Sequence, residues 1–391
     1  MNAEQVNFDP WLPDTSADGL PLSGVRVLDF SAFLPGPLTS LVLAEAGADV
    51  LRIEPPAGDP LREFEPKLGS ASAMYAILNR GKRVFGADLT EDRDRAAVLN
   101  IVETAAVVLV QARPSDVGRQ GLDYETLRRR NPRLIHCVIT GYGQAGPLAE
   151  RPGYDLTYLA DSGLLDAALA ADSRPVLPAT AVADIAGGSY PAIVNILLAL
   201  RRRDITGQGT SIVVSMTHNL QLMSYRHFVS RQISGAWADP QADMLGGGSA
   251  RYHVYPTRDE HFVAVYAIAD RSWTRLSHVV GLDPRYVGTA DQQEAIQAMR
   301  ALFGRRPAAH WQRLFSSTGV KASIVSDFAA AERAGLINTE SQDRVASDER
   351  EIGALPSVLA PELRRPPSVL PSPPLRDLPV PCRVFNSDES S

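Results

Sequence analysis

The sequence predicts an α/β protein with a doubly wound sheet in a large domain, followed by a smaller α/β domain. In the first half of the chain, short runs of aliphatic residues alternate with segments of helical character. This is the pattern of parallel strands joined by crossover helices. After Thr217 the composition changes to more aromatic residues and a run of three glycines. A chain of 391 residues is also long enough for about two domains.

The first strand–helix–strand unit lies between residues 25 and 53. Val25–Phe30 (VRVLDF) and Asp49–Ile53 are expected to be strands, with a helix at Leu38–Ala46 between them. Gly47 follows this helix at the position where a left-handed residue often ends one. Two strands joined in this way are almost always parallel, with a right-handed crossover.

The same alternation continues to about residue 216. The further strands and helices that we expect are, in order, Arg83–Asp88, Glu91–Thr104, Val107–Gln111, Tyr124–Arg130, Leu134–Thr140, Ile185–Arg203 and Ser211–Met216, with one strand of the smaller domain at His261–Tyr266. We therefore divide the chain into an N-terminal tail (1–21), a large domain (22–216), a small domain (217–340) and a proline-rich C-terminal arm (341–391). Ligands of such sheets usually bind at the strand ends.

Composition excludes several classes of protein. The net charge of −6 argues against general nucleic-acid binding, which needs a basic face. The two cysteines, Cys137 and Cys382, cannot form a disulfide framework or a four-ligand zinc site, and no histidine pair has metal-ligand spacing. We expect no signal peptide and no apolar run of about 20 residues, hence no membrane contact and a cytoplasmic protein. The turn after the first strand lacks the G-x-G-x-x-G pattern of dinucleotide-binding proteins.

Eight segments resemble the class III CoA-transferase (CaiB/BaiF) superfamily, most closely its α-methylacyl-CoA racemase branch. They follow one another in the family's order over residues 22–216, and a weaker match continues in GGGSARYHVYPTRDEHFVAVYAIAD. The segments are LSGVRVLDFSAFLPGP, LAEAGADVLRIEPPAGDPLR, NRGKRVFGADL, ARPSDVGRQGLDYETLRRRNPRLI, ITGYGQAGP, RPGYDLTYLADSG, ATAVADIAGGS and TGQGTSIVVSM.

The resemblance implies a Rossmann-like large domain and a smaller domain in an interlocked homodimer. It also implies that coenzyme A, as an acyl-CoA, and a carboxylic acid are the substrates, with no bound cofactor and no metal.

Asp184, in the segment AVADIAGG, matches the family's catalytic aspartate. The resemblance implies that its carboxylate attacks an acyl-CoA thioester and then forms an aspartyl-CoA thioester. Its position directly before a predicted helix favours the ionised form, because the N-terminus of a helix is positive. The simpler interpretation is that Asp184 only caps the helix, which is worth about 1 kcal/mol. The glycines that follow favour catalysis, because they let a ligand approach the backbone closely.

Tyr154 and Asp155 stand where the racemases have a His-Asp pair. The resemblance implies that, in the racemases, this histidine and this aspartate are the two bases that exchange the α-proton. A tyrosine with an ordinary pKa near 10 is a poor general base at neutral pH. Ala269 also stands where racemases tend to have a glutamate. Both differences favour CoA transfer over racemisation.

The resemblance places five cations and a glycine loop in the CoA site. Arginine and lysine side chains bind phosphates through charged hydrogen bonds. The glycines match a loop that covers the covalent intermediate in some transferases, although an interdomain hinge is an equally good interpretation. The residues are Arg52, Arg80, Lys82, Arg83 and Arg113, with Gly246, Gly247 and Gly248.

Three functions remain open at this point. The leading one is a CoA-transferase that uses Asp184. The second is a 2-methylacyl-CoA racemase or epimerase, and the third is a catalytically silent acyl-CoA-binding homologue, which the unusual C-terminal residues favour and Asp184 opposes. The acyl group and the acceptor acid do not appear as a motif.

Overall fold

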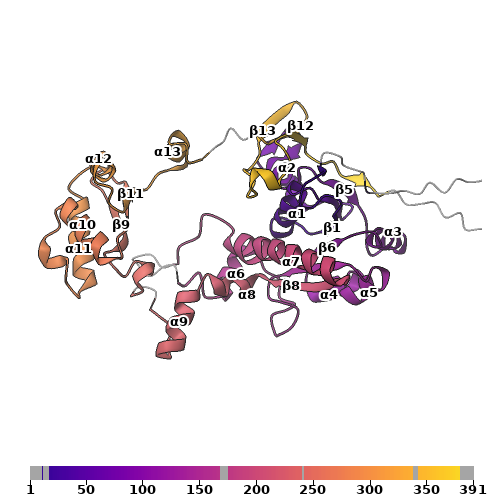
Figure 1. The fold of residues 1–391 in the computed structure, drawn as a ribbon, viewed down its shortest axis with the longest axis horizontal. Helices are drawn as coiled ribbons and strands as arrows, with labels where there is room; N and C mark the ends of the chain where they lie inside the picture. Colours follow the sequence, from indigo (N-terminus) through magenta and orange to yellow (C-terminus); the bar gives the residue numbers. More distant parts are fainter. Residues whose placement is uncertain (1–10, 12–16, 168–174, 240–241, 338–341, 379–391) are drawn as a thin grey trace, which may run out of the picture. The chain divides into compact units, whose positions relative to one another are not determined.

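The computed structural model describes residue 11 and residues 17–167, 175–239, 242–337 and 342–378 (Figure 1). Most of the expected N-terminal tail, 1–21, and the end of the expected arm, 379–391, lie outside these residues. The chain forms two compact units. The first comprises the described parts of Met1–Ser162, Ala179–Gln221 and Thr339–Ser391, and the second those of Gly163–Pro178 and Leu222–Asn338.

A seven-stranded parallel sheet forms the centre of the first unit, which confirms the predicted α/β class. Apart from the short edge strand at the C-terminal end of the described chain, the order β5-β2-β1-β6-β7-β8 is that of a Rossmann sheet. The strands, in spatial order, are β15 (Arg376–Asp377), β5 (Arg83–Gly86), β2 (Asp49–Glu54), β1 (Arg26–Phe30), β6 (Val107–Gln111), β7 (Ile135–Thr140) and β8 (Thr210–Ser215).

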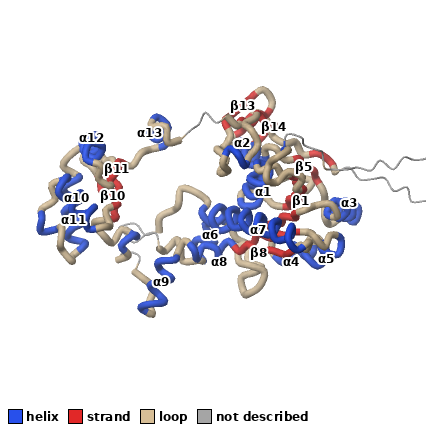
Figure 2. The backbone as a smooth tube through the Cα atoms, in the orientation of Figure 1, coloured by secondary structure: helices blue, strands red, loops and turns tan. Residues whose placement is uncertain are grey.

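Helices cover both faces of this sheet (Figure 2). Leu28, Leu51 and Val108 point to one face, where they pack with Val98 of α3 and Leu127 of α5 in a continuous core. The neighbouring residues of each strand point to the other face, because side chains alternate along a strand. The helices are α1 (Pro35–Glu45), α3 (Asp92–Val102), α4 (Pro114–Arg119), α5 (Tyr124–Arg130), the π-helical η3 (Ala183–Ser189) and α7 (Tyr190–Thr206).

The opposite face of the sheet carries α1 and α7. Asp29 of β1 points this way and accepts a hydrogen bond from Ser40 of α1 at 2.5 Å. Helix α7 contacts both α1 and the strands β7 and β8. Because η3 and α7 run on from one another, they form one long helix over the half of the sheet that ends in β8 (Figure 1).

Smaller elements complete the first unit. The described part of the proline-rich arm adds a three-stranded sheet and the edge strand β15, which pairs with β5. The elements are η2 (Pro60–Glu63), β3 (Lys67–Leu68), β4 (Ala71–Ser72), α2 (Ala73–Asn79), α6 (Asp155–Asp161), α8 (Met216–Asn219), η4 (Leu220–Leu222), β12 (Arg344–Ser347), β13 (Arg350–Gly353), η7 (Pro361–Leu363) and β14 (Val369–Pro371).

The second unit is a three-stranded antiparallel sheet with helices packed on it. Its core combines aliphatic side chains with several aromatic ones, among them Tyr255, Trp273, Phe303 and Trp311. The elements are α9 (Tyr225–Ser234), η5 (Met244–Gly246), β9 (Tyr252–Pro256), β10 (Phe262–Tyr266), α10 (Asp270–Val280), η6 (Pro284–Tyr286), α11 (Gln292–Phe303), α12 (Ala308–Thr318), β11 (Ala322–Ile324) and α13 (Phe328–Arg333).

One helical stretch in the described part of the chain, Ala183–Thr206, is long and apolar enough to cross a membrane by length and composition alone. This corrects the expectation that no apolar segment reaches that length, and the reason is that η3 and α7 are continuous. Half of its most apolar window is buried, and α7 contacts β7 and β8. A helix that packs on a sheet has this composition as well.

Candidate active site

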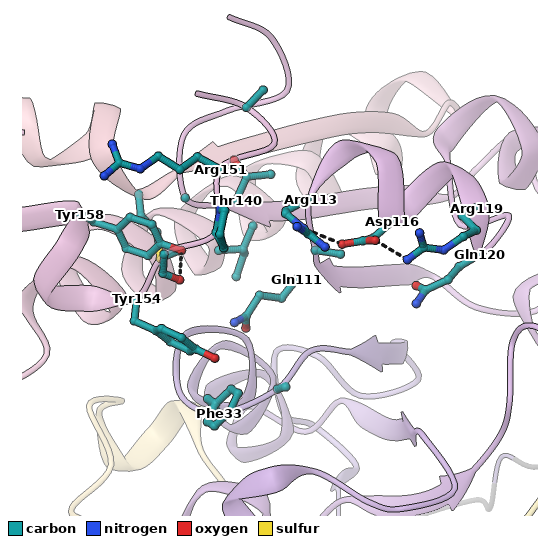
Figure 3. Close-up of a pocket in the computed structure, with 18 residues that line it drawn as sticks. Phe33, Gln111, Arg113, Asp116, Arg119, Gln120, Thr140, Arg151, Tyr154 and Tyr158 are labelled. Atoms are coloured by element: carbon teal, nitrogen blue, oxygen red, sulfur yellow. Dashed lines mark hydrogen bonds and ion pairs between the residues drawn. The ribbon is translucent and has the colours of Figure 1, made fainter. Parts of the chain in front are cut away.

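A cavity of about 510 Å³ opens at the carboxyl ends of the central strands (Figure 3). Four of the lining residues lie just after strands: Phe33 follows β1, Arg113 follows β6, Gly141 follows β7 and Met216 follows β8. After β1 the chain continues to one side of the sheet, and after β6 it continues to the other. Doubly wound sheets bind their ligands in the crevice that this reversal leaves.

Three arginines line this cavity. Arg113 Nε lies 2.8 Å from Asp116 Oδ2, and Arg119 pairs with the second oxygen of the same carboxylate (Figure 3). Arg151 Nη1 lies 3.1 Å from Asp161 Oδ2. The Arg113 side chain is 47% exposed, so its remaining N–H groups are open to a ligand. Only Arg113 belongs to the cations expected from the sequence.

Aromatic rings and one amide form the facing wall. The ring of Tyr154, which is 69% exposed, meets the ring of Phe33 edge to face at 5.8 Å. Phe33 has a φ of 59°, a left-handed conformation that is unusual for a bulky residue. Its backbone amide donates a hydrogen bond of 3.2 Å to Asp59 Oδ2. Gln111 Oε1 accepts a hydrogen bond from the Gly36 amide at 3.1 Å, which joins the loop after β1 to the end of β6.

Asp184 lies beside this cavity and next to Asp155. Its backbone amide donates a hydrogen bond of 3.0 Å to Asp155 Oδ1, and Asp155 follows Tyr154 at the start of α6. Burial, together with the Asp184 charge, raises the pKa of Tyr158, which is one of the residues that line the cavity. The structure thus brings together the three predicted residues Tyr154, Asp155 and Asp184.

The carboxyl group of Asp184 is difficult to ionise. Partial burial, reinforced by the negative charge of Asp155, raises its pKa to about 7. This corrects the expectation that the helix N-terminus makes ionisation easier. Among the described residues no hydrogen bond reaches the Asp184 side chain, and Val182 occupies the N-cap position of η3. Asp184 is therefore not a helix cap, and its carboxyl group is available to a ligand.

Two glycines after Asp184 bring η3 close to its neighbours. A Cβ atom on Gly187 would lie 2.6 Å from the carbonyl oxygen of Met216, and one on Gly188 would lie 3.1 Å from a carbon of Pro35. The Ser189 hydroxyl donates to the Pro35 carbonyl at 2.9 Å. These glycines were expected to let a ligand approach. In the structure they let the ends of β8 and α1 approach instead, and this packing positions Asp184.

Arg52, which was expected at the CoA phosphates, lies inside the first unit. Its side chain has no exposed surface, and its Nε lies 2.9 Å from Glu54 Oε1. It also pairs with Asp59 and, at 3.8 Å, with Asp29, and it donates to Asn79 at 3.2 Å. A buried guanidinium needs such partners. We therefore exclude Arg52 from the phosphate site, because its role is to hold the ends of β1 and β2 together.

Three other expected cations also lie away from the cavity. Arg80 is buried and paired with Glu45, while Arg83 pairs with Asp49. Lys82 is buried, donates to a carbonyl of α1 at 2.8 Å, and has a pKa well below its usual value because of burial. Their positions after α2 and in β5 made them resemble ligand-binding loops in the sequence. In the structure each of them is bonded to an acceptor of the first unit instead.

The three expected glycines belong to the second unit. Gly246 and Gly247 line a separate cavity there, and the Gly248 amide donates to the Asp243 carbonyl at 3.0 Å. Gly247 has a φ of 98°, which glycine adopts without strain. Ala269 is the N-cap residue of α10 in the same unit.

Comparison with known proteins identifies the family. The model of CoA-transferase family III matches residues 22–375. The chain is 32% identical to the acetyl-CoA:oxalate CoA-transferase of Acetobacter aceti over 83% of its own length and 85% of that protein. It is 30% identical to the human α-methylacyl-CoA racemase over 82% and 84% of the two chains.

A solved structure agrees with this assignment. The crystal structure of a CaiB/BaiF family protein from Brucella suis superposes with a TM-score of 0.70 at 28% identity, and covers 80% of this chain and 86% of that one. The chain therefore belongs to CoA-transferase family III.

The raised pKa of Asp184 predicts a change in stability with pH. The folded protein binds a proton at this group more tightly than the unfolded chain, whose aspartate titrates near 3.8. Stability is therefore lost as the pH rises from about 4 to 7. Asp184→Asn, which mimics the neutral acid, should raise the free energy of unfolding at pH 8. Because water screens the partly exposed group, the gain should be about 1–2 kcal/mol.

Urea unfolding followed by circular dichroism would measure this at pH 8 and pH 4.5, with Asp92→Asn as the matched control because the Asp92 side chain is 91% exposed. The gain from Asp184→Asn should be much smaller at pH 4.5. Equal stability of Asp184→Asn and the wild type at pH 8 would show that Asp184 titrates normally.

Proposed function

We propose that the protein is a CoA-transferase that moves coenzyme A from an acyl-CoA thioester to a carboxylic acid through Asp184. The observation that carries the proposal is the Asp184 carboxyl group, which is unbonded among the described side chains and lies beside the strand-end cavity. A carboxylate whose oxygens accept no hydrogen bond from the protein has its lone pairs available to attack a bound thioester. The relationship to the acetyl-CoA:oxalate CoA-transferase of Acetobacter aceti supports the reaction type.

The reaction divides into four steps at this carboxylate. An Asp184 oxygen attacks the thioester carbonyl, and the C–S bond breaks to release CoA thiolate and leave a mixed anhydride. The thiolate attacks the Asp184 carbonyl carbon, which expels the first acid and forms the aspartyl-CoA thioester. The acceptor carboxylate then attacks this thioester and releases the thiolate. Finally the thiolate attacks the acceptor carbonyl, which frees Asp184 as a carboxylate and gives the new acyl-CoA.

The cavity provides a place for the anionic part of coenzyme A. Among the described residues, Arg113, Arg119 and Arg151 are the cations that line it, and each is exposed enough to contact a phosphate while it keeps its carboxylate partner. The two aromatic rings of Phe33 and Tyr154 give the opposite wall an apolar surface. Tyr154 and Asp155 complete the proposed site, Tyr154 by contact with the ligand and Asp155 through its contact with Asp184.

A 2-methylacyl-CoA racemase is the second candidate, and the pKa of Asp184 favours it. A general acid or base works best when its pKa lies near the pH of the reaction, and the pKa of Asp184 is raised to about 7. The relationship to the human racemase also supports this candidate. It requires a second base, however, and a tyrosine, Tyr154, stands where the racemases have their histidine. Burial raises the pKa of Tyr158, which makes it a weaker acid still.

The proposed transfer can be measured directly. Purified protein would be incubated with a panel of short-chain acyl-CoAs and ¹⁴C-labelled carboxylic acids, and new labelled acyl-CoA would be separated by chromatography. The wild type should form labelled acyl-CoA, and its rate should rise with pH through about 7 as Asp184 ionises. Asp184→Asn should lose at least about a thousandfold in rate, because an amide is a poor nucleophile.

Asp92→Asn again serves as the control and should keep the wild-type rate. Unchanged transfer by Asp184→Asn would contradict the assignment of the nucleophile.

The proposed phosphate site predicts how the loss of one arginine changes the affinity for CoA. Arg113→Ala should weaken CoA binding by about 1.5–3 kcal/mol, the range of a hydrogen bond to a charged group. Arg128→Ala is a matched control, because Arg128 is also exposed and pairs with a carboxylate three residues away, but lies outside the cavity. Isothermal titration calorimetry with CoA would compare the two. Equal affinities of the two variants would remove Arg113 from the proposed site.

A homodimer is the assembly that the surface supports. Helix α7 exposes an apolar stripe of Tyr190, Val194, Leu197, Leu198 and Ile205, which lie on one helical face. Helix α9 buries none of its residues and exposes a similar stripe of Tyr225, Phe228, Val229 and Ile233. Contiguous apolar side chains on an exposed helix face usually mark a protein interface. A second copy of this chain would cover both.

Light scattering should therefore give the mass of a dimer at micromolar concentration. The double change Leu198→Arg and Ile233→Arg should shift it towards the monomer, since it places a charge in each stripe. Gln297→Arg, a charge on an exposed position of α11, should leave the dimer intact. A monomeric wild-type protein would contradict the proposal.

A further inference from the structure

A proline lies inside the long helix that carries Asp184. The helix continues from η3 into α7, and Pro191 is the second residue of α7. In an α-helix each N–H bonds to the carbonyl oxygen four residues earlier, so a residue at position 191 would donate to Gly187. Proline has no N–H, and its ring crowds that same carbonyl group. The Gly187 carbonyl therefore lacks the donor that an ordinary residue at position 191 would supply.

The backbone just before Pro191 is widened. The segment η3 is π-helical, and the Tyr190 amide donates to the Ile185 carbonyl, which is five residues back instead of four. The wider turn gives the proline ring room, and α-helical bonding resumes in α7. Single turns of this kind inside α-helices are frequently found at functional sites. This one begins one residue before Asp184.

Asn219 supplies the missing donor from a different element. It is the last residue of α8, and its Nδ2 donates a hydrogen bond of 2.7 Å to the Gly187 carbonyl oxygen. The bond joins the wide turn to the segment that follows β8, 32 residues further along the chain. Gly187 is buried. A buried carbonyl group that loses its only side-chain partner is costly, because water does not replace the lost hydrogen bond freely.

We propose that Asn219 is a positioning residue for Asp184, because it gives Gly187 the hydrogen bond that Pro191 cannot give. Gly187 lies three residues after Asp184 in the same wide turn, so the bond restrains the backbone that carries the reactive carboxyl group. Near the start of this turn, the Asp184 amide is bonded to Asp155. The two bonds together set the orientation of the turn. The inference rests on the proposed function of Asp184, and Asn219 acts through the backbone, since it does not line the cavity.

Asn219→Leu tests the proposal, because leucine has nearly the same shape as asparagine and donates no hydrogen bond. In the assay with labelled acids its kcat should fall about tenfold or more, since a small displacement of a reacting group costs much of the rate. KM for acyl-CoA should stay within about twofold of the wild-type value, because the cavity that binds CoA is unchanged. Asn195→Leu is the matched control. Asn195 also donates to a helix carbonyl, that of Pro191 at 2.8 Å, but it is exposed, and this variant should keep the wild-type kcat.

A second change, Pro191→Ala, tests whether Asn219 acts through the Gly187 carbonyl. Alanine at position 191 restores an N–H that can bond to Gly187. The combined variant Pro191→Ala, Asn219→Leu should therefore recover most of the wild-type kcat. A general defect in α8 would not be repaired by a change in α7, so this rescue separates positioning from a merely structural role.

Melting temperatures give the same comparison without any substrate. Asn219→Leu should lower the melting temperature by several degrees in the wild-type background and by clearly less in the Pro191→Ala background, because the two changes act on one carbonyl group. If Asn219→Leu alone does not fold, the combined variant should still fold.

Two results would overturn the proposal. One is an unchanged kcat of Asn219→Leu, and the other is a combined variant with no gain over Asn219→Leu in either kcat or melting temperature. The proposed function fails by a different result, which is a wild type that transfers no label or an Asp184→Asn variant that keeps the transfer rate. In that case the melting temperatures still decide whether Asn219 replaces the N–H that Pro191 lacks.

Discussion

The hydrogen bond from the Asp184 amide to the Asp155 carboxylate is the contact on which the candidate site depends. It joins two segments that are 29 residues apart in the chain and places two carboxyl groups side by side. One consequence is positional, because Asp155 begins α6 directly after Tyr154, which lines the strand-end cavity. The other is electrostatic, since the charge of Asp155 adds to the cost of burying a charge on Asp184 and keeps the pKa of Asp184 near 7.

Close packing around η3 also fixes the position of Asp184. Gly187 and Gly188 allow η3 to lie against Met216 and Pro35, so that the first turn of the long helix is set by the ends of β8 and α1. The buried guanidinium of Arg52 fixes the ends of β1 and β2 through three carboxylates. The loops that form the cavity therefore start from a rigid frame. A reactive carboxyl group benefits from such a frame, because its orientation is set before the ligand binds.

The fold and the place of Asp184 beside Tyr154 and Asp155 could be predicted from the sequence, whereas most of the cations that line the cavity could not. Strand and helix periods are local properties, so β1 and β2 appear in the pattern within one residue of their observed bounds, although α1 begins three residues earlier than expected, at Pro35. Burial is not local. Arg52 and Lys82 resemble phosphate-binding residues in sequence, and only the fold shows that they satisfy buried acceptors. Arg119 lies at the end of α4 and Arg151 in a loop after β7, and the sequence pattern does not show that both reach the cavity.

The covalent step is the central claim, and trapping tests it most directly. The protein would be mixed with an acyl-CoA in deuterated buffer, quenched with hydroxylamine and digested, and the peptide that contains Asp184 would be analysed by mass spectrometry. The account predicts a hydroxamate on Asp184, because hydroxylamine intercepts an aspartyl anhydride or thioester. Deuterium at the α-carbon of the recovered acyl-CoA, with an unmodified Asp184 peptide, would contradict it and identify a proton-transfer enzyme instead.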